Sequence, residues 1–114
     1  MVIEKIQVQY VDNELYIIAS TGAGSSELCH VKSGYYKIDP LTIYPGAILP
    51  ELIGGQSYDI TLIGINWGGP SKFIIKFIWQ DGSEENRELD SGTEDIGCVW
   101  HEKISGVNVK TPKI

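Results

Sequence analysis

The chain contains very little cysteine, because only Cys29 and Cys98 occur among its 114 residues. Small secreted scaffolds depend on a dense framework of disulfides, and two cysteines do not supply one. We therefore predict two free thiols. Both side chains lie in phase with apolar neighbours, so both are predicted to be buried. A single disulfide that closes a long loop is the alternative if the protein is exported.

Long hydrophobic runs are also absent. The apolar stretches Ile60–Ile65 and Phe73–Trp79 are interrupted by Thr61, Gly64 and Lys76. Both are far shorter than the ~18 residues that a membrane-spanning helix needs. The N-terminus lacks the basic and apolar regions of a secretory signal. We expect a protein that does not span a membrane and is cytoplasmic by default, with secretion as the alternative if the chain is trimmed.

Basic residues are few, with 9 Lys and Arg against 15 Asp and Glu and a formal net charge of −6. No basic stripe is present to neutralise phosphates, which argues against nucleic acid as a partner. The segment from Asp81 to Asp95 carries seven of the acids and a single base, Arg87. We interpret it as a solvated hairpin that keeps the protein soluble. Binding of Ca²⁺ or of a basic partner is the alternative.

Residues that favour helices are scarce, since Ala, Leu and Met together number 11, whereas Ile, Val, Thr and the aromatic residues number 40. β-branched and aromatic side chains fit a pleated sheet. The 13 Gly and 5 Pro mostly separate the apolar runs and mark turns. The chain is therefore predicted to be one domain, residues 1–114, with an all-β fold. The expected architecture is an antiparallel β-sandwich of about eight or nine short strands, immunoglobulin-like or jelly-roll.

Alternation of apolar and polar residues locates the expected strands. In the N-terminal half they are Val2–Tyr10, Glu14–Ser20, Leu28–Lys32, Tyr35–Asp39 and Thr42–Tyr44. A turn at Asp12-Asn13 predicts that the first two pair as a hairpin. The segment Thr21–Ser26 is predicted to be a flexible loop.

In the C-terminal half the expected strands are Tyr58–Asn66, Phe73–Trp79, Glu84–Leu89, Ile96–Ile104 and Val107–Lys110. The first two are apolar on both faces, which predicts central positions joined by a tight hairpin at Trp67–Pro70. Asp81-Gly82 predicts a two-residue hairpin turn, after which Glu84–Leu89 returns as a polar edge strand. On the next strand, Ile96, Cys98, Trp100 and Ile104 are expected to face inwards.

Motifs for catalysis, nucleotides or metals are weak. The glycine-rich stretch before Glu27 lacks the third glycine of a dinucleotide fingerprint, and no helix follows it. Zinc would need Cys29, His30, Cys98 and His101 together, but on strands Cys29 and His30 point to opposite faces, as do Cys98 and His101.

The only candidates for a nucleophile and base are Ser25 or Ser26 with His30, and no nucleophile elbow surrounds them. We therefore expect a protein that is not an enzyme and has no catalytic residues, metal or cofactor.

Aromatic residues are the remaining signal. Trp79 and Trp100 share strand phase with core residues, whereas Trp67 follows its strand and precedes Gly68-Gly69-Pro70. An indole on a compact turn can stack on a sugar face or enter a lipid interface, and folding over the end of the sandwich is the structural alternative. The candidate ligand-binding residues are Trp67, Gly68, Gly69, Tyr35, Tyr36 and Tyr44.

These features give three hypotheses, because a β-sandwich does not define a function. The first is a non-enzymatic recognition module that binds a glycan or another surface ligand through its end loops. The second is a membrane-active or toxin-like protein that uses exposed aromatics at a lipid interface. The third is a structural or assembly protein that pairs through edge strands, including pairing between copies of this chain.

Overall fold

The computed structural model describes residues 2–21, 24–34, 41–43, 57–90 and 96–109. The regular elements in these ranges are all strands, which confirms the predicted all-β class. Their bounds are β1 Val2–Val11, β2 Asn13–Thr21, β3 Gly24–Gly34, β4 Leu41–Ile43, β5 Ser57–Asn66, β6 Lys72–Trp79, β7 Glu84–Asp90 and β8 Gly97–Val109. The described ranges contain no helix long and apolar enough to cross a membrane.

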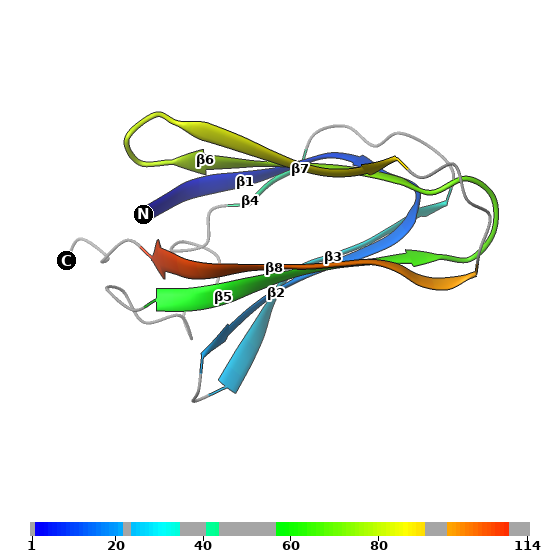
Figure 1. Ribbon diagram of the computed structural model, residues 1–114, viewed down its shortest axis with the longest axis horizontal. Coiled ribbons are helices and arrows are strands. Elements are labelled where there is room, and N and C mark those ends of the chain that lie inside the picture. The colour runs from blue at the N-terminus through cyan, green and yellow to red at the C-terminus, as the bar shows by residue number, and fades with distance from the viewer. Residues whose placement is uncertain (1, 22–23, 35–40, 44–56, 91–95, 110–114) are drawn as a thin grey trace.

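Hydrogen bonding joins the strands into one eight-stranded sheet in the order β3-β2-β5-β8-β1-β6-β7, with β4 beside β1. Figure 1 shows that β1, β4, β6 and β7 lie in one layer and β2, β3, β5 and β8 in the other. The layers connect where Val2 and Ile3 pair with Asn108 and Val109 in parallel. The sheet is therefore mixed, and the expectation of a purely antiparallel arrangement is wrong. The two segments meet at the end of the molecule where β1 begins and β8 ends (Figure 1).

The hydrophobic core contains the inward-facing side chains of both layers. On β5 and β6 burial alternates strictly, as expected for the inner face of a sheet. Phe73 stacks on Trp100 of the opposite layer, with ring centroids 5.5 Å apart. Both Trp79 and Trp100 are buried, as their phase predicted. Strands β5 and β6 each have a neighbour on both sides, which confirms their predicted central positions.

Two predicted hairpins are instead crossings between the layers. β1 and β2 meet at Asp12-Asn13 but do not pair, and neither do β5 and β6 around Trp67–Pro70. Asn13 has a φ of 71°, and the Asp12 N–H donates to the Lys72 carbonyl, 2.9 Å away. The chain turns out of one layer at each point and enters the other. The local pattern identified the turns correctly but not the partners of the strands.

The first hairpin of the chain is β2–β3. The register pairs Thr21 with Gly24, so β3 is longer than the predicted Leu28–Lys32 strand. Ser25 and Ser26, predicted in a flexible loop, lie in β3. A register shift between the Ile17–Cys29 and Ile18–Glu27 pairs leaves Leu28 and Cys29 both buried. The predicted strand Tyr35–Asp39 lies outside the described residues.

The β6–β7 hairpin confirms a turn at Asp81-Gly82 and a strand that returns at the end of the sheet order. The turn is longer than the two residues predicted. The Trp79 N–H donates to the Ser83 carbonyl at 2.9 Å, and Gly82, with a φ of 90°, donates to the Trp79 carbonyl at 3.0 Å. Three residues therefore form the loop, with glycine at its left-handed position.

Strand β8 is continuous where two strands, Ile96–Ile104 and Val107–Lys110, were predicted. Register shifts interrupt its pairing with β5 near both ends. Trp100 and Ile104 are buried, as predicted, but Ile96 is 71% exposed and Cys98 is also exposed. Gly64 pairs with Trp100 and Ile65 with Cys98, so Val99 is an extra residue that breaks the alternation. The predicted burial of Ile96 and Cys98 is therefore wrong. Cys29 is buried, and burial raises the pKa of its thiol to about 11.

Candidate functional site

The turn after β5 is held by two buried asparagines. Asn66 is fully buried, and its Oδ1 accepts from Asn13 Nδ2 at 2.8 Å and from the Gly68 N–H at 3.1 Å. Its Nδ2 donates to the Gly69 carbonyl at 2.8 Å, and Asn13 Nδ2 also donates to the Gly68 carbonyl at 3.3 Å. Gly69 has a φ of 84°, a conformation that favours glycine. The network fixes the backbone on both sides of this turn relative to β2.

Trp67 is the first residue of the turn and is 55% exposed. Its indole Nε1 donates to Glu14 Oε1 at 2.8 Å, which fixes the ring by its polar edge. Lys32 Nζ lies 6.0 Å from the ring centroid, within the range of a cation–π contact. Trp67 is therefore a surface residue with a defined orientation.

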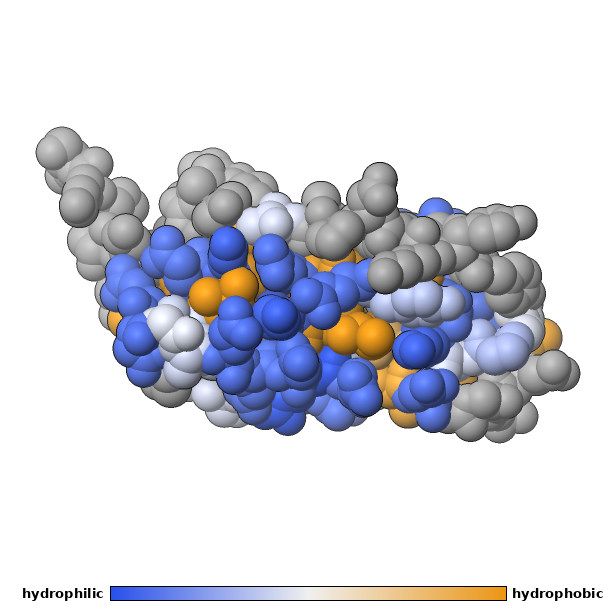
Figure 2. All heavy atoms as spheres, turned by 90° about the horizontal axis from the view of Figure 1, so that it is seen from above, coloured by the Kyte–Doolittle hydropathy of each residue, from blue (hydrophilic) through white to orange (hydrophobic). Residues whose placement is uncertain are grey.

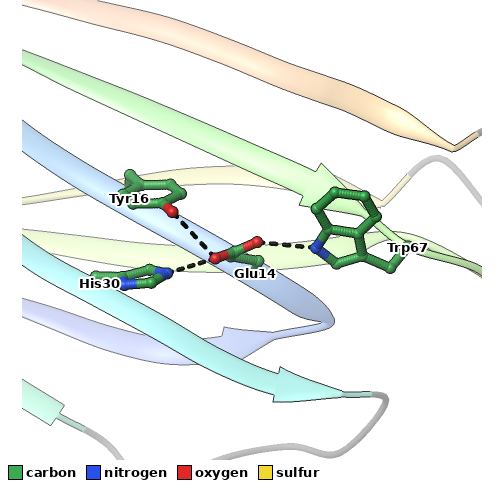
Figure 3. A network of polar contacts seen from close by, with 4 residues as sticks. All are labelled: Glu14, Tyr16, His30 and Trp67. Atoms are coloured by element: carbon green, nitrogen blue, oxygen red, sulfur yellow. Dashed lines mark hydrogen bonds and ion pairs between the residues drawn. The ribbon is translucent and has the colours of Figure 1, made fainter.

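Glu14 is the centre of this site, although its side chain is only 8% exposed. Its second oxygen, Oε2, accepts from the Tyr16 hydroxyl at 3.1 Å and from His30 Nε2. Figure 3 shows Trp67 on one side of the carboxylate and Tyr16 and His30 on the other. A buried carboxylate is stable in a protein when hydrogen bonds replace its hydration, and three donors do so here.

Tyr16 and His30 form a stacked pair beside Glu14. They face each other in the β2–β3 register, with ring centroids 4.1 Å apart and an interplanar angle of 7°. The His30 and Trp67 hydrogen bonds lower the pKa of Glu14, so it is ionised at neutral pH. Burial, with the adjacent Glu14 carboxylate, raises the pKa of Tyr16, so its hydroxyl remains a donor.

The structure describes some of the predicted site residues, and it brings further residues to the same place. It places Trp67, Gly68 and Gly69 in one turn, while Tyr35, Tyr36 and Tyr44 lie outside the described residues. It adds Glu14, Tyr16, His30 and Lys32, none of which was predicted to bind a ligand. No local signal identifies Glu14, because its donors come from β2, β3 and the end of β5. Only the strand register brings them together.

The histidines and serines are not arranged as a hydrolase would need. His30 contacts Glu14, whereas Ser25 and Ser26 pair with Ser20 and Ala19, farther along β2. His101 is exposed on β8. Within the described ranges, no group of three or more His, Cys, Asp or Glu side chains is arranged to hold a metal ion.

Comparisons with protein families, with curated proteins and with solved structures found no match to this chain. Arguments about its function therefore depend on the site itself.

Proposed function

We propose that the protein is a non-enzymatic recognition module that binds a glycan or another surface ligand through its end loops, with Trp67 as the main contact. The observation that carries the proposal is an indole 55% exposed but fixed by a hydrogen bond to a buried carboxylate. Sugars bind aromatic side chains through their apolar faces, and an indole ordered in advance loses little conformational freedom on binding.

The proposal includes the finer architecture, a β-sandwich. The two layers enclose one core and carry the Trp67 turn at a crossing between them. Folds of this kind commonly bind ligands through the turns that connect two rigid layers. The buried Asn13–Asn66 hydrogen bond makes this turn more rigid than an ordinary surface loop.

One observation favours the lipid-interface hypothesis as a second candidate. Trp67 and Ile96 are the exposed large hydrophobic residues of the described ranges. Asn66 pairs with Gly97, so the residues that follow Asn66 and precede Gly97 lie at the same end of the sheet. An aromatic and an aliphatic side chain at one end would suit insertion into a membrane surface.

The test compares Trp67→Ala with Trp100→Ala. Replacement of the half-exposed Trp67 should cost about 1 to 3 kcal/mol of stability, because the buried Glu14 loses one of its three donors, whereas replacement of the buried Trp100 should cost about 3 to 5 kcal/mol. A glycan array and pelleting with phosphatidylcholine–phosphatidylserine liposomes then measure binding. We expect glycan binding by the wild type and its loss in Trp67→Ala.

Binding to the liposomes alone, lost in Trp67→Ala, would replace the first function with the second. If Trp67→Ala unfolds the protein as readily as Trp100→Ala, Trp67 is a lid of the core and both proposals fail.

A further inference from the structure

A ligand at this site would meet an exposed positive charge beside Trp67, although the protein as a whole is negatively charged. Glu14 Oε1 accepts from Trp67, and Oε2 accepts from Tyr16 and His30. With its carboxylate buried and occupied by three donors, Glu14 has little capacity to bind a ligand. Among the described residues, the Lys32 ammonium faces solvent beside the Trp67 ring, and the His30 imidazole lies on the other side of the Glu14 carboxylate (Figure 3).

Lys32 is placed by the β2–β3 register. Lys32 pairs with Glu14 in this register and is exposed. Its Nζ lies 6.0 Å from the Trp67 ring centroid. His30 pairs with Tyr16, one step farther along the same face, and its side chain is 38% exposed. An exposed ammonium therefore lies beside an aromatic surface, an arrangement suited to an anionic group carried by a stacked ring.

The net negative charge of the chain comes from the acidic residues between Asp81 and Asp95. The described ones between Asp81 and Asp90 belong to the β6–β7 hairpin, which is in the other layer (Figure 1). Glu27 lies on β3 but pairs with Ile18, beyond the Tyr16–His30 pair from Lys32. Interactions between exposed charges are largely screened beyond about 8 Å at physiological ionic strength. Within the described ranges, the charged groups that contact Trp67 are the buried Glu14 carboxylate, whose oxygens accept from three donors, and the exposed Lys32 ammonium.

We propose that the ligand of this site is an anionic saccharide, with one sugar face stacked on Trp67 and a carboxylate or sulfate bound by Lys32. The inference rests on the proposed recognition function and specifies its ligand class. A charge-assisted hydrogen bond from the Lys32 ammonium gives the acidic sugar its advantage over a neutral one.

The experiment measures dissociation constants by calorimetry for matched oligosaccharides that are neutral, uronate-containing or sulfated. We expect wild type to bind an acidic member at least about tenfold more tightly than the neutral one, the size of one charge-assisted contact. Lys32→Gln should reduce this ratio towards one, and Lys32→Arg should keep it. The uronate and sulfate arms identify which anion is bound.

Lys103→Gln is the matched control, because Lys103 is an exposed lysine on β8 that pairs with Asp59 at 3.2 Å, away from Trp67. It removes the same charge and should leave the ratio unchanged. Circular dichroism of each variant confirms its fold.

Three results would overturn the inference. Equal binding of neutral and acidic sugars, sensitive to Trp67→Ala, would refute the anionic ligand but keep the recognition function. If Lys103→Gln and Lys32→Gln weaken the preference for acidic sugars equally, that preference comes from the overall charge of the protein and not from Lys32. Absence of Trp67-dependent binding to every glycan would refute both proposals.

Discussion

At the scale of single residues, the candidate site depends most on Glu14. Its carboxylate connects the exposed Trp67 to the Tyr16–His30 pair and is itself almost fully buried. Removing one partner of a buried charged contact costs more than the contact contributes, because the remaining groups lose their hydration without compensation. Glu14 is therefore a positioning residue: it orients Trp67 without needing to touch a ligand.

The lowered pKa of Glu14 predicts a dependence of stability on pH. Its pKa lies below the usual 4.5 in the folded protein, so the folded state is favoured while Glu14 is ionised. This contribution is present above the usual pKa and is lost as the pH falls through the lower folded pKa. Between pH 6 and pH 3 the wild type should lose more thermal stability than Glu14→Gln, and at pH 6 the variant should be less stable by about 1 to 3 kcal/mol.

Thermal melts of both proteins across this range provide the measurement. Asp81, whose pKa its contacts with Ser83 lower, and Asp12, whose pKa burial raises, also titrate in acid. Both are present in each protein, so the difference between the two curves reports Glu14 together with its hydrogen-bond partners Tyr16, His30 and Trp67. Parallel curves would show that Glu14 contributes no charge-dependent stability.

At the scale of elements, the close approach of β5 and β6 depends on a glycine. A Cβ added to Gly64 would lie 2.7 Å from ring atoms of Phe73. Phe73 is fully buried and stacks on Trp100, so the ring has little room to move. Gly64→Ala should therefore destabilise the protein by about 1 to 3 kcal/mol through overpacking.

Chemical denaturation of a double-mutant cycle tests the cause. Phe73→Leu alone should also destabilise, because it leaves a cavity. In that background Gly64→Ala should cost less than it does in the wild type, since the smaller side chain leaves space for the methyl group. Additive costs would show that the Gly64 effect does not come from Phe73.

The strands themselves were largely predictable, and their pairing was not. Alternation and turn residues located β1, β2, β5, β6 and β7 within a few residues. The same local pattern fits a hairpin and a crossing between layers equally well. The strands on either side of Asp12-Asn13, and those on either side of Trp67–Pro70, were therefore wrongly predicted to pair with each other. A strand with apolar residues on both faces gives no local signal for its neighbour.

The site was predictable only where a turn defines it. The glycines and proline after Trp67 predicted an exposed indole, and the structure places it at the surface. Glu14, Tyr16 and His30 meet through strand register, which no single segment encodes. The extra residue at Val99 likewise breaks the period of two and exposes Cys98. Sequence periodicity has no access to such irregularities.

At the scale of the whole molecule, the outer surface of the layer formed by β1, β4, β6 and β7 is strongly polar. Figure 2 shows a mainly hydrophilic face with a few hydrophobic residues between the hydrophilic ones. Lys76 and Glu84 approach to 3.7 Å, as do Lys72 and Asp90. Exposed pairs of this kind stabilise a protein little. Charged side chains at this density favour solubility instead.

The two ends of the sheet order differ in charge, which bears on pairing between copies. β7 carries four acids and one base, Arg87, whereas β3 carries one acid, Glu27, with Lys32 and His30. An exposed strand edge can pair with another copy, and like charges on both strands oppose that pairing. We therefore expect the acidic residues of β7 to keep this edge unpaired.

Replacement of Glu84 and Glu88 by Thr removes two exposed charges from β7 and introduces residues that favour strands. The variant should form dimers or larger species as its concentration rises, measured by size-exclusion chromatography with light scattering. Raising the salt concentration to about 1 M should also promote association of the wild type, because the screening length falls to about 3 Å.

Glu4→Thr with Asp59→Asn is the control, since it removes two charges from β1 and β5, which have neighbours on both sides. If the control associates as strongly as the β7 variant, net charge rather than the edge governs solubility. If neither associates, the acids of β7 have no protective role, and the assembly hypothesis must depend on β3.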